Sequence, residues 1–195
     1  MKGDRYPRLD AEALTAAQKR VHDRIVEGPR GEVVGPLRVW LQSPGLAERA
    51  QALGAFVRYD SGLESRLSEL AILVTARIWS SGFEWTHHAP IARKAGISKG
   101  VIESIGHGIR PALADSESRA VFEVAVALHR DRWIDETTFV EAREVLGLDR
   151  LVDLVGICGY YSLISMTINA FEVPEGEGPA LPAIDIPAER MFCDN

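Results

Sequence analysis

The chain has 195 residues, 46% of them hydrophobic, and a formal net charge of −6 at pH 7. This length fits one domain, and the apolar share is large enough to bury a sizeable core. Acidic and basic residues alternate without forming a basic patch, which argues against a nucleic-acid partner because phosphates call for a concentrated basic face.

No targeting signal is visible near the N-terminus. Residues 1–7 lack the apolar core of a secretory signal, and no run of the sequence approaches the ~18 apolar residues of a membrane span. The two cysteines, Cys158 and Cys193, are far apart and follow no pairing pattern, as is usual in a reducing compartment. We therefore expect a cytoplasmic protein with no membrane partner.

Apolar residues recur at helical spacing through most of the chain and predict an all-α fold. Thr15 is a candidate N-cap within the first helix, Ser43-Pro44 opens the second, and Ser98 caps a short helix. The Gly- and Pro-rich stretch 28–36 is a loop without a phosphate-binding glycine pattern. The predicted helices cover 9–27, 43–59, 67–79, 81–96, 98–105, 115–130, 136–146 and 149–171.

The C-terminal segment is expected to be extended. Residues 174–187 contain too many prolines and glycines for a helix. Leu181, Ile184 and Ile186 are spaced along this segment, so we expect it to lie along a neighbouring surface. The predicted organisation is an N-terminal helix (1–27), one helical domain (28–173) and an extended Pro/Gly-rich tail (174–195), without internal repeats.

Glu84 and His88 form the first candidate pair for chemistry. They are four residues apart on a predicted helix, so they project from the same face, and His87 lies at the flank of that face. An exposed pair of this kind stabilises a helix by about 0.2–0.5 kcal/mol. In an enclosed site the same pair can transfer protons near neutral pH. The spacing leaves both interpretations open.

Glu69 is the second candidate. It lies within the strongly apolar helix 67–79, so its carboxylate faces packed side chains unless a cavity opens there. Burial without a partner is costly and raises the pKa of a carboxylate. A functional site and a buried ion pair with Arg66 or Arg77 both explain such a residue.

The last predicted helix is apolar along most of its length. Its small and hydroxylated residues allow close approach of other helices and predict packing or oligomer contacts. They are Tyr160, Tyr161, Ser162, Ser165, Thr167 and Asn169.

Glu69, Ser81, Glu84 and His88, followed by Ala95-Gly96, have a spacing that resembles the carboxymuconolactone decarboxylase and alkyl hydroperoxidase D superfamily. In its peroxidase branch the order is Glu, Cys-x-x-Cys, and His four residues after the second cysteine. The resemblance extends from about residue 28 to 182. It implies a single-domain alkyl hydroperoxidase D-like helical bundle that forms a homo-oligomer, a trimer or a hexamer.

The cysteine positions separate this chain from the peroxidase branch. Ser81 and Glu84 stand where that branch has its two cysteines, and neither supplies the thiolate or the resolving thiol that disulfide exchange needs. Cys158 in an apolar helix and Cys193 in the tail are expected to be inert. The chain therefore resembles the decarboxylase-like branch, and thiol peroxidase activity is not expected.

The resemblance implies a carboxy-lyase that acts on a small carboxylated lactone, or a related acid, without a cofactor. Glu69, Glu84 and His88 would be the catalytic residues, and Trp85 and His87 would line the pocket or an adjoining contact. In the family the loop equivalent to 28–36 lies near the pocket mouth, so Arg30 and Arg38 are candidate anchors for a substrate carboxylate.

The same residues are compatible with other functions. The same groups could isomerise or hydrolyse a lactone, because a fold does not fix a function. The chain could also be a peroxidase-related member without thiol peroxidase activity. In a non-catalytic oligomer, Glu69, Arg77 and His88 would form a satisfied buried network.

A metal site and a loop histidine are further alternatives. Glu84 and His87 form a Glu-x-x-His of the type found in di-iron bundles, but the second copy that such sites need does not occur. A lone metal on Glu69, Glu84 and His88 would suit iron or zinc, although we expect none. His107 lies in a glycine-rich loop, where it could reach a site or be solvated.

Overall fold

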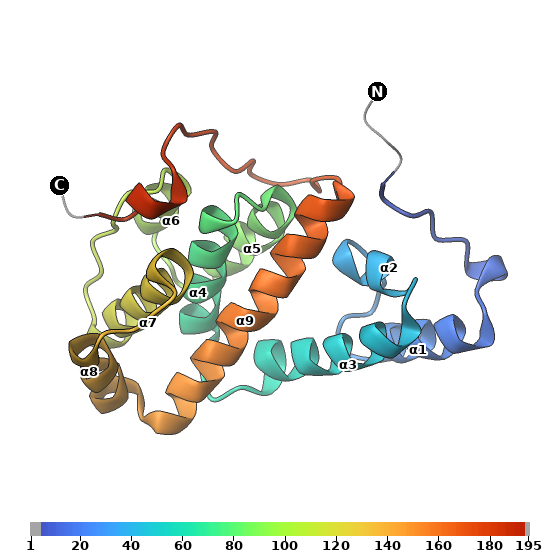
Figure 1. The fold of residues 1–195 in the computed structure, drawn as a ribbon, viewed down its shortest axis with the longest axis horizontal. Helices are drawn as coiled ribbons and strands as arrows, with labels where there is room; N and C mark the ends of the chain where they lie inside the picture. Colours follow the sequence, from blue (N-terminus) through green and yellow to red (C-terminus); the bar gives the residue numbers. More distant parts are fainter. Residues whose placement is uncertain (1–4, 194–195) are drawn as a thin grey trace.

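The computed structural model describes residues 5–193, and every regular element in that range is helical (Figure 1). Short 3-10 turns lie at Ala11–Ala13 and Ala188–Arg190, and π-helical turns at Phe56–Asp60 and Ala127–Asp131. The predicted all-α single-domain class is confirmed. The α-helices are α1 (Ala16–Glu27), α2 (Pro36–Trp40), α3 (Pro44–Ala55), α4 (Ser65–Ile78), α5 (Gly82–Lys94), α6 (Lys99–Gly106), α7 (Ser116–Val126), α8 (Glu136–Leu146) and α9 (Leu148–Phe171).

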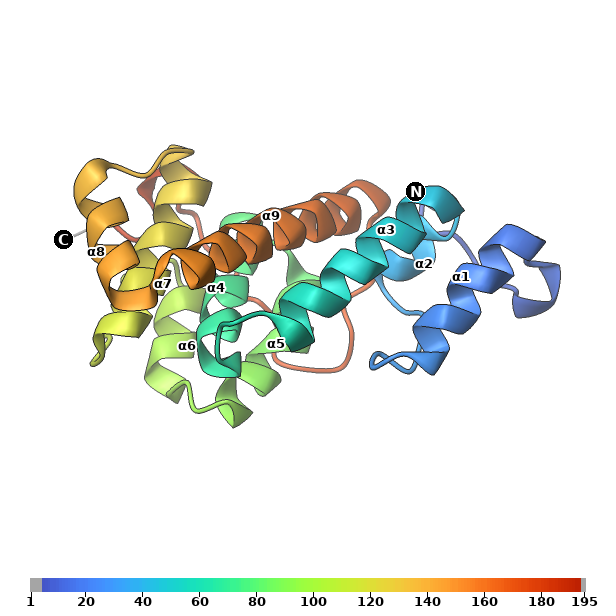
Figure 2. The same cartoon turned by 90° about the horizontal axis from the view of Figure 1, so that it is seen from below.

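Helix α4 forms the centre of the core. Every residue from 67 to 77 of this helix is buried, as the apolar run predicts. It packs against α5, α7 and α9, and the long helix α9 crosses the middle of the molecule (Figure 1). Helices α7 and α8 lie at one end, whereas α1, α2 and α3 extend to the other, with α3 alongside α9 (Figure 2).

The start of α1 confirms one local prediction and corrects another. Thr15 caps α1 through a capping box in which its hydroxyl accepts from the amide of Gln18, so the predicted cap is confirmed. The helix expected over 9–27 is interrupted, however, because Leu14 and Thr15 are extended. Neither α2 nor the two π-helical turns was predicted, since a π turn keeps an apolar pattern close to that of an α-helix.

Helix α9 departs from the expectation that no segment could span a membrane. By length and composition α9 could cross a membrane, because the mean hydropathy of its most apolar 18-residue window is 1.6. However, 56% of that window is buried inside the structure. It packs against α2, α4, α7 and α8. In this fold α9 is a core helix, which accounts for its apolar character.

The tail after α9 forms no helix until the turn at Ala188–Arg190, and the surface along which it lies belongs to its own chain. Thr86 of α5 donates to the carbonyl of Pro179 at 3.4 Å, and the amide of Phe192 donates to the carbonyl of Gly108 at 2.8 Å. Phe192 is buried, with its ring centroid 5.3 Å from that of Phe122. The tail therefore closes the core on the side of α5, α6 and α7.

Candidate active site

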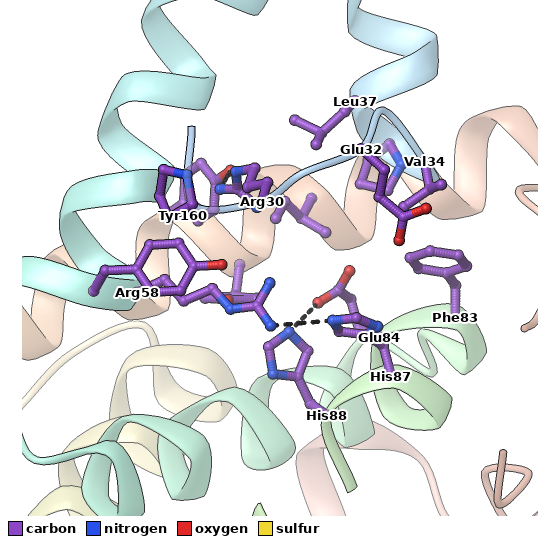
Figure 3. Close-up of a pocket in the computed structure, with 15 residues that line it drawn as sticks. Arg30, Glu32, Val34, Leu37, Arg58, Phe83, Glu84, His87, His88 and Tyr160 are labelled. Atoms are coloured by element: carbon purple, nitrogen blue, oxygen red, sulfur yellow. Dashed lines mark hydrogen bonds and ion pairs between the residues drawn. The ribbon is translucent and has the colours of Figure 1, made fainter. Parts of the chain in front are cut away.

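A cavity of about 270 Å³ lies among the loop before α2, the π turn 56–60, α5 and α9. It is slightly smaller than the ~300–1,000 Å³ of most ligand pockets, which favours a small ligand. The apolar side chains in its wall include Leu37, Phe83 and Ile164. The polar and charged side chains in the wall are Arg30, Glu32, Arg58, Tyr59, Glu84, His87, His88, Tyr160 and Tyr161 (Figure 3).

Three of the predicted residues meet at one wall of this cavity. His88 Nδ1 lies 2.8 Å from Glu69 Oε2 in a hydrogen bond. His88 Nε2 lies 3.2 Å from Glu84 Oε2, although that carboxylate oxygen has no well-aligned hydrogen-bond donor. The contact between His88 and Glu84 is therefore an ion pair (Figure 3). All three side chains are buried.

The fold explains why Glu69 reaches His88. A short turn joins α4 to α5, in which Ser80 takes a left-handed conformation with φ of 49°. The chain reverses there, and the two helices pack closely against each other. The contact between Glu69 and His88 thus joins neighbouring helices, whereas the one between Glu84 and His88 arises within α5 from the helical repeat.

The two carboxylates keep His88 protonated near neutral pH. Burial by itself lowers the pKa of a histidine, but the negative charge of Glu69, its hydrogen bond and the nearby Glu84 outweigh burial and raise the pKa of His88 to about 9. At neutral pH the ring therefore carries a proton on each nitrogen. A buried imidazolium at a cavity wall is suited to donate a proton.

Glu69 and Glu84 occupy different positions relative to the cavity. Glu84 and His88 line it, whereas Glu69 contacts His88 from behind and does not. This is the arrangement in which a carboxylate fixes the tautomer and orientation of a histidine. Glu69 is thus placed to orient the ring of His88, and Glu84 is the carboxylate that borders the cavity.

His87 lines the cavity, as expected, and is held by Arg58. Arg58 donates to His87 Nε2 at 3.2 Å, so the ring carries its proton on Nδ1, because an arginine only donates. Removal from water and the positive charges of His88 and Arg58 lower the pKa of His87 to about 4. His87 is consequently neutral at neutral pH, although part of its side chain is exposed.

Two arginines face the cavity without an acidic partner. Arg30 donates to the hydroxyl of Tyr160 at 3.2 Å, and its Nε is buried without a partner. Arg58 contacts His87 and the ring of Tyr59. Neither forms an ion pair with a carboxylate among residues 5–193. Unpaired guanidinium groups in a cavity favour an anionic ligand.

Several sequence expectations about this site are corrected by the structure. Trp85 does not line the cavity; it is buried against Gly106. Arg38 also lies outside the lining and stacks on Tyr6 at 4.5 Å. In the opposite sense, Tyr160 and Tyr161, which were expected to serve packing or oligomer contacts, line the cavity.

The arginines expected as partners of Glu69 are engaged elsewhere. Arg66 forms an ion pair with Asp115 at 3.2 Å. Arg77 donates to the carbonyl oxygens of Gly106 and Pro182 at 3.0 and 2.7 Å. The network expected for a non-catalytic oligomer, in which Arg77 joins Glu69 and His88, is therefore not formed.

The remaining candidates lie away from the cavity. His107 is exposed, and its Nδ1 contacts the carbonyl of Glu103 at 2.8 Å. Burial raises the pKa of the Cys158 thiol to about 12, which leaves it protonated. Cys193 is exposed in the tail. Among residues 5–193, no three His, Cys, Asp or Glu side chains are grouped so that they could hold a metal ion.

Comparison with known proteins agrees with this architecture. Residues 44–127, which include α3, α4 and α5, match the carboxymuconolactone decarboxylase family. No curated protein sequence matches the chain. Among solved structures, an uncharacterized peroxidase-related protein from Silicibacter sp. TM1040 superposes with a TM-score of 0.70 at 15% identity, covering 88% of this chain and 90% of that one.

Two further structures share the fold. The alkylhydroperoxidase AhpD core of an uncharacterized peroxidase-related protein from Ralstonia eutropha JMP134 has a TM-score of 0.69 at 17% identity, covering 89% of this chain and 92% of that one. The debrominase Bmp8, solved with 2,3,4-tribromopyrrole, has a TM-score of 0.70 at 12% identity, covering 91% and 94%. Residues 44–127 thus match the carboxymuconolactone decarboxylase family, and the alkyl hydroperoxidase D-like helical fold is shared with these solved structures.

Proposed function

We propose that this protein is a cofactor-independent enzyme that performs acid–base chemistry, decarboxylation or a related lactone reaction, on a small carboxylated substrate. The observation that carries the proposal is the buried imidazolium of His88, held by Glu69 and Glu84 at the wall of a cavity that also contains unpaired Arg30 and Arg58. Such a site combines a proton donor with groups suited to bind a carboxylate. Cytoplasmic location is part of the same proposal.

Each residue has a role that follows from its position. Arg30 and Arg58 bind a carboxylate of the substrate. When a carboxylate leaves as carbon dioxide, the remaining carbanion is protonated by His88, which lines the cavity. Glu69 holds the ring in place. Glu84 stabilises the imidazolium of His88 before the transfer and relays a proton from water to the neutral ring afterwards.

The direct test is carbon dioxide release from 4-carboxymuconolactone by the purified, chelator-treated protein. We expect release by the wild type and a fall in turnover of about 10²-fold in Glu84→Gln, because removal of a group that takes part in proton transfer costs about 10²–10⁴-fold. The variant should stay folded, with its unfolding midpoint lowered only as far as loss of the ion pair between Glu84 and His88 accounts for. Absence of release would eliminate decarboxylation of this lactone, and loss of stability with unchanged turnover would indicate a structural role for Glu84.

A second prediction concerns the carboxylate-binding arginines. We expect Arg58→Gln to raise KM about 10- to 100-fold, since a charge-assisted hydrogen bond contributes about 1.5–3 kcal/mol. Arg38→Gln is the matched control, because Arg38 lies outside the cavity, and it should leave KM unchanged. Equal effects of the two substitutions on steady-state KM would show that general charge, and no local contact, attracts the substrate.

Association into a homo-oligomer also belongs to the proposal. Several large apolar side chains are exposed on α9 and at the end of α3, including Val152, Met166, Leu53 and Phe56. Exposed apolar surface of this kind favours contact with a further copy. Light scattering coupled to gel filtration measures the assembly, and a monomer at all concentrations would contradict it.

A further inference from the structure

Tyr161 of α9 lies beside His88 in the cavity wall. Its ring is perpendicular to the imidazole of His88, with centroids 5.1 Å apart at 88°. It is also perpendicular to the ring of Tyr160, with centroids 5.4 Å apart at 88°. Edge-to-face contacts on two sides hold an aromatic ring in a fixed orientation. The position of the Tyr161 hydroxyl is therefore set by ring packing.

The hydroxyl of Tyr161 has no hydrogen-bond partner among residues 5–193, although the side chain is only 3% exposed. Two other hydroxyls of α9 have partners, since Tyr160 accepts from Arg30 and Ser162 donates to the carbonyl of Cys158. The buried hydroxyl of Ser165 has none, but Ser165 lies outside the cavity lining. The hydroxyl oxygen of Tyr161 is not among the fully buried, unpartnered polar atoms of the described residues, so it retains access to the cavity. Because Tyr161 lines the cavity, a ligand atom there can supply the missing partner.

The environment of Tyr161 keeps its hydroxyl protonated. Burial, reinforced by the negative charge of Glu84, raises the pKa of Tyr161 well above its ordinary value of 10. The phenol is thus a hydrogen-bond donor throughout the pH range in which His88 titrates. A preorganised donor in a water-poor site is most effective where negative charge develops during a reaction.

We propose that Tyr161 donates a hydrogen bond to the substrate oxygen that becomes negatively charged during the reaction. This inference rests on the proposed function. The bond between the substrate carbon and its carboxylate breaks, carbon dioxide leaves, and the electron pair is delocalised onto the conjugated carbonyl oxygen. Tyr161 keeps its proton and stabilises this oxyanion. The proton of His88 then adds to carbon, the electron pair returns from oxygen, and His88 regains a proton from water.

Ligand binding tests the contact without requiring turnover. Benzoate, 3-hydroxybenzoate and 4-hydroxybenzoate share a carboxylate for the arginines, and only the last two carry a further oxygen that could accept a hydrogen bond from Tyr161. We expect Tyr161→Phe to weaken the tighter hydroxybenzoate about tenfold in calorimetric titration, while benzoate changes by less than about twofold. Equal weakening of all three compounds, or of none, would overturn the proposal.

Kinetics supply the second readout. Tyr161→Phe should lower kcat for the lactone about 10²-fold with little change in KM, as removal of one oxyanion donor does elsewhere. Tyr6→Phe is the control, because Tyr6 lies outside the cavity lining, and it should leave kcat unchanged. Unchanged kcat in a folded Tyr161→Phe enzyme would also overturn the proposal.

The two experiments separate failure of this inference from failure of the proposed function. If benzoate binds through Arg58 but the wild type releases no carbon dioxide, the proposed decarboxylation is wrong. The difference between benzoate and the hydroxybenzoates then still tests the hydrogen bond from Tyr161. If carbon dioxide is released and Tyr161→Phe matches the wild type in both assays, the reaction stands and the role of Tyr161 is wrong. If benzoate does not bind at all, the carboxylate site and this inference both fail.

Discussion

The Glu69→Gln variant is expected to lose turnover by about 10³-fold while KM stays within about twofold of the wild type. Glutamine has the shape of glutamate and can still accept from His88 Nδ1, but it removes the charge that orients the imidazole and stabilises its protonated form. Replacement of the orienting carboxylate in a serine-protease triad by its amide lowers kcat by about 10⁴-fold. Steady-state kinetics with the lactone measure the effect.

A structural role for Glu69 makes a different prediction, and the titration of His88 distinguishes the two. Loss of the negative charge should move the pKa of His88 down from about 9, which NMR of the ring protons detects. If Glu69→Gln lowers the unfolding midpoint but leaves turnover and the His88 titration unchanged, Glu69 serves only to pack α4 against α5.

Protein stability should fall as pH rises through the pKa of His88. The folded-state pKa is raised from 6.5 to about 9, so the folded state binds the proton more tightly than the unfolded chain. The contribution is complete below about pH 6.5 and is lost as pH rises through about 9. At about 1.4 kcal/mol per pKa unit, it amounts to roughly 3 kcal/mol.

Urea unfolding at about pH 6 and about pH 10 measures this loss. The His88→Gln variant is the reference, because it retains all other titrating groups. We expect the free energy of unfolding to fall more steeply with pH in the wild type than in this variant. Parallel pH dependences would show that the buried ring gains no net stability from Glu69 and Glu84.

The sequence was sufficient for the part of the site that depends on local spacing. Glu84 and His88 are one helical turn apart, so their contact follows from the helical repeat. Trp85 follows Glu84 by one position, about 100° around α5, on the side away from Phe83 and His87, which line the cavity. The prediction that Trp85 lines the pocket or an adjoining contact did not take this angle into account.

Residues from distant parts of the chain were harder to place. Glu69 meets His88 because the turn at Ser80 reverses the chain, and the resemblance to a family, more than periodicity, indicated that contact. Tyr160 and Tyr161 were ambiguous because α9 is apolar on nearly every face, so its pattern does not reveal which side borders a cavity. Arg58 was missed because nothing in its local pattern distinguishes a π turn from an α turn.

The π turn at Phe56–Asp60 makes the composition of the cavity depend on the exact length of one short segment. A π turn holds one residue more than an α turn over nearly the same rise. Deletion of one residue before Arg58 would restore regular α-helix and rotate the following side chains by about 100°, which would carry Arg58 and Tyr59 out of the wall that they now line. Ligand preference could thus change through a single-codon deletion that leaves His88 and both of its carboxylates in place.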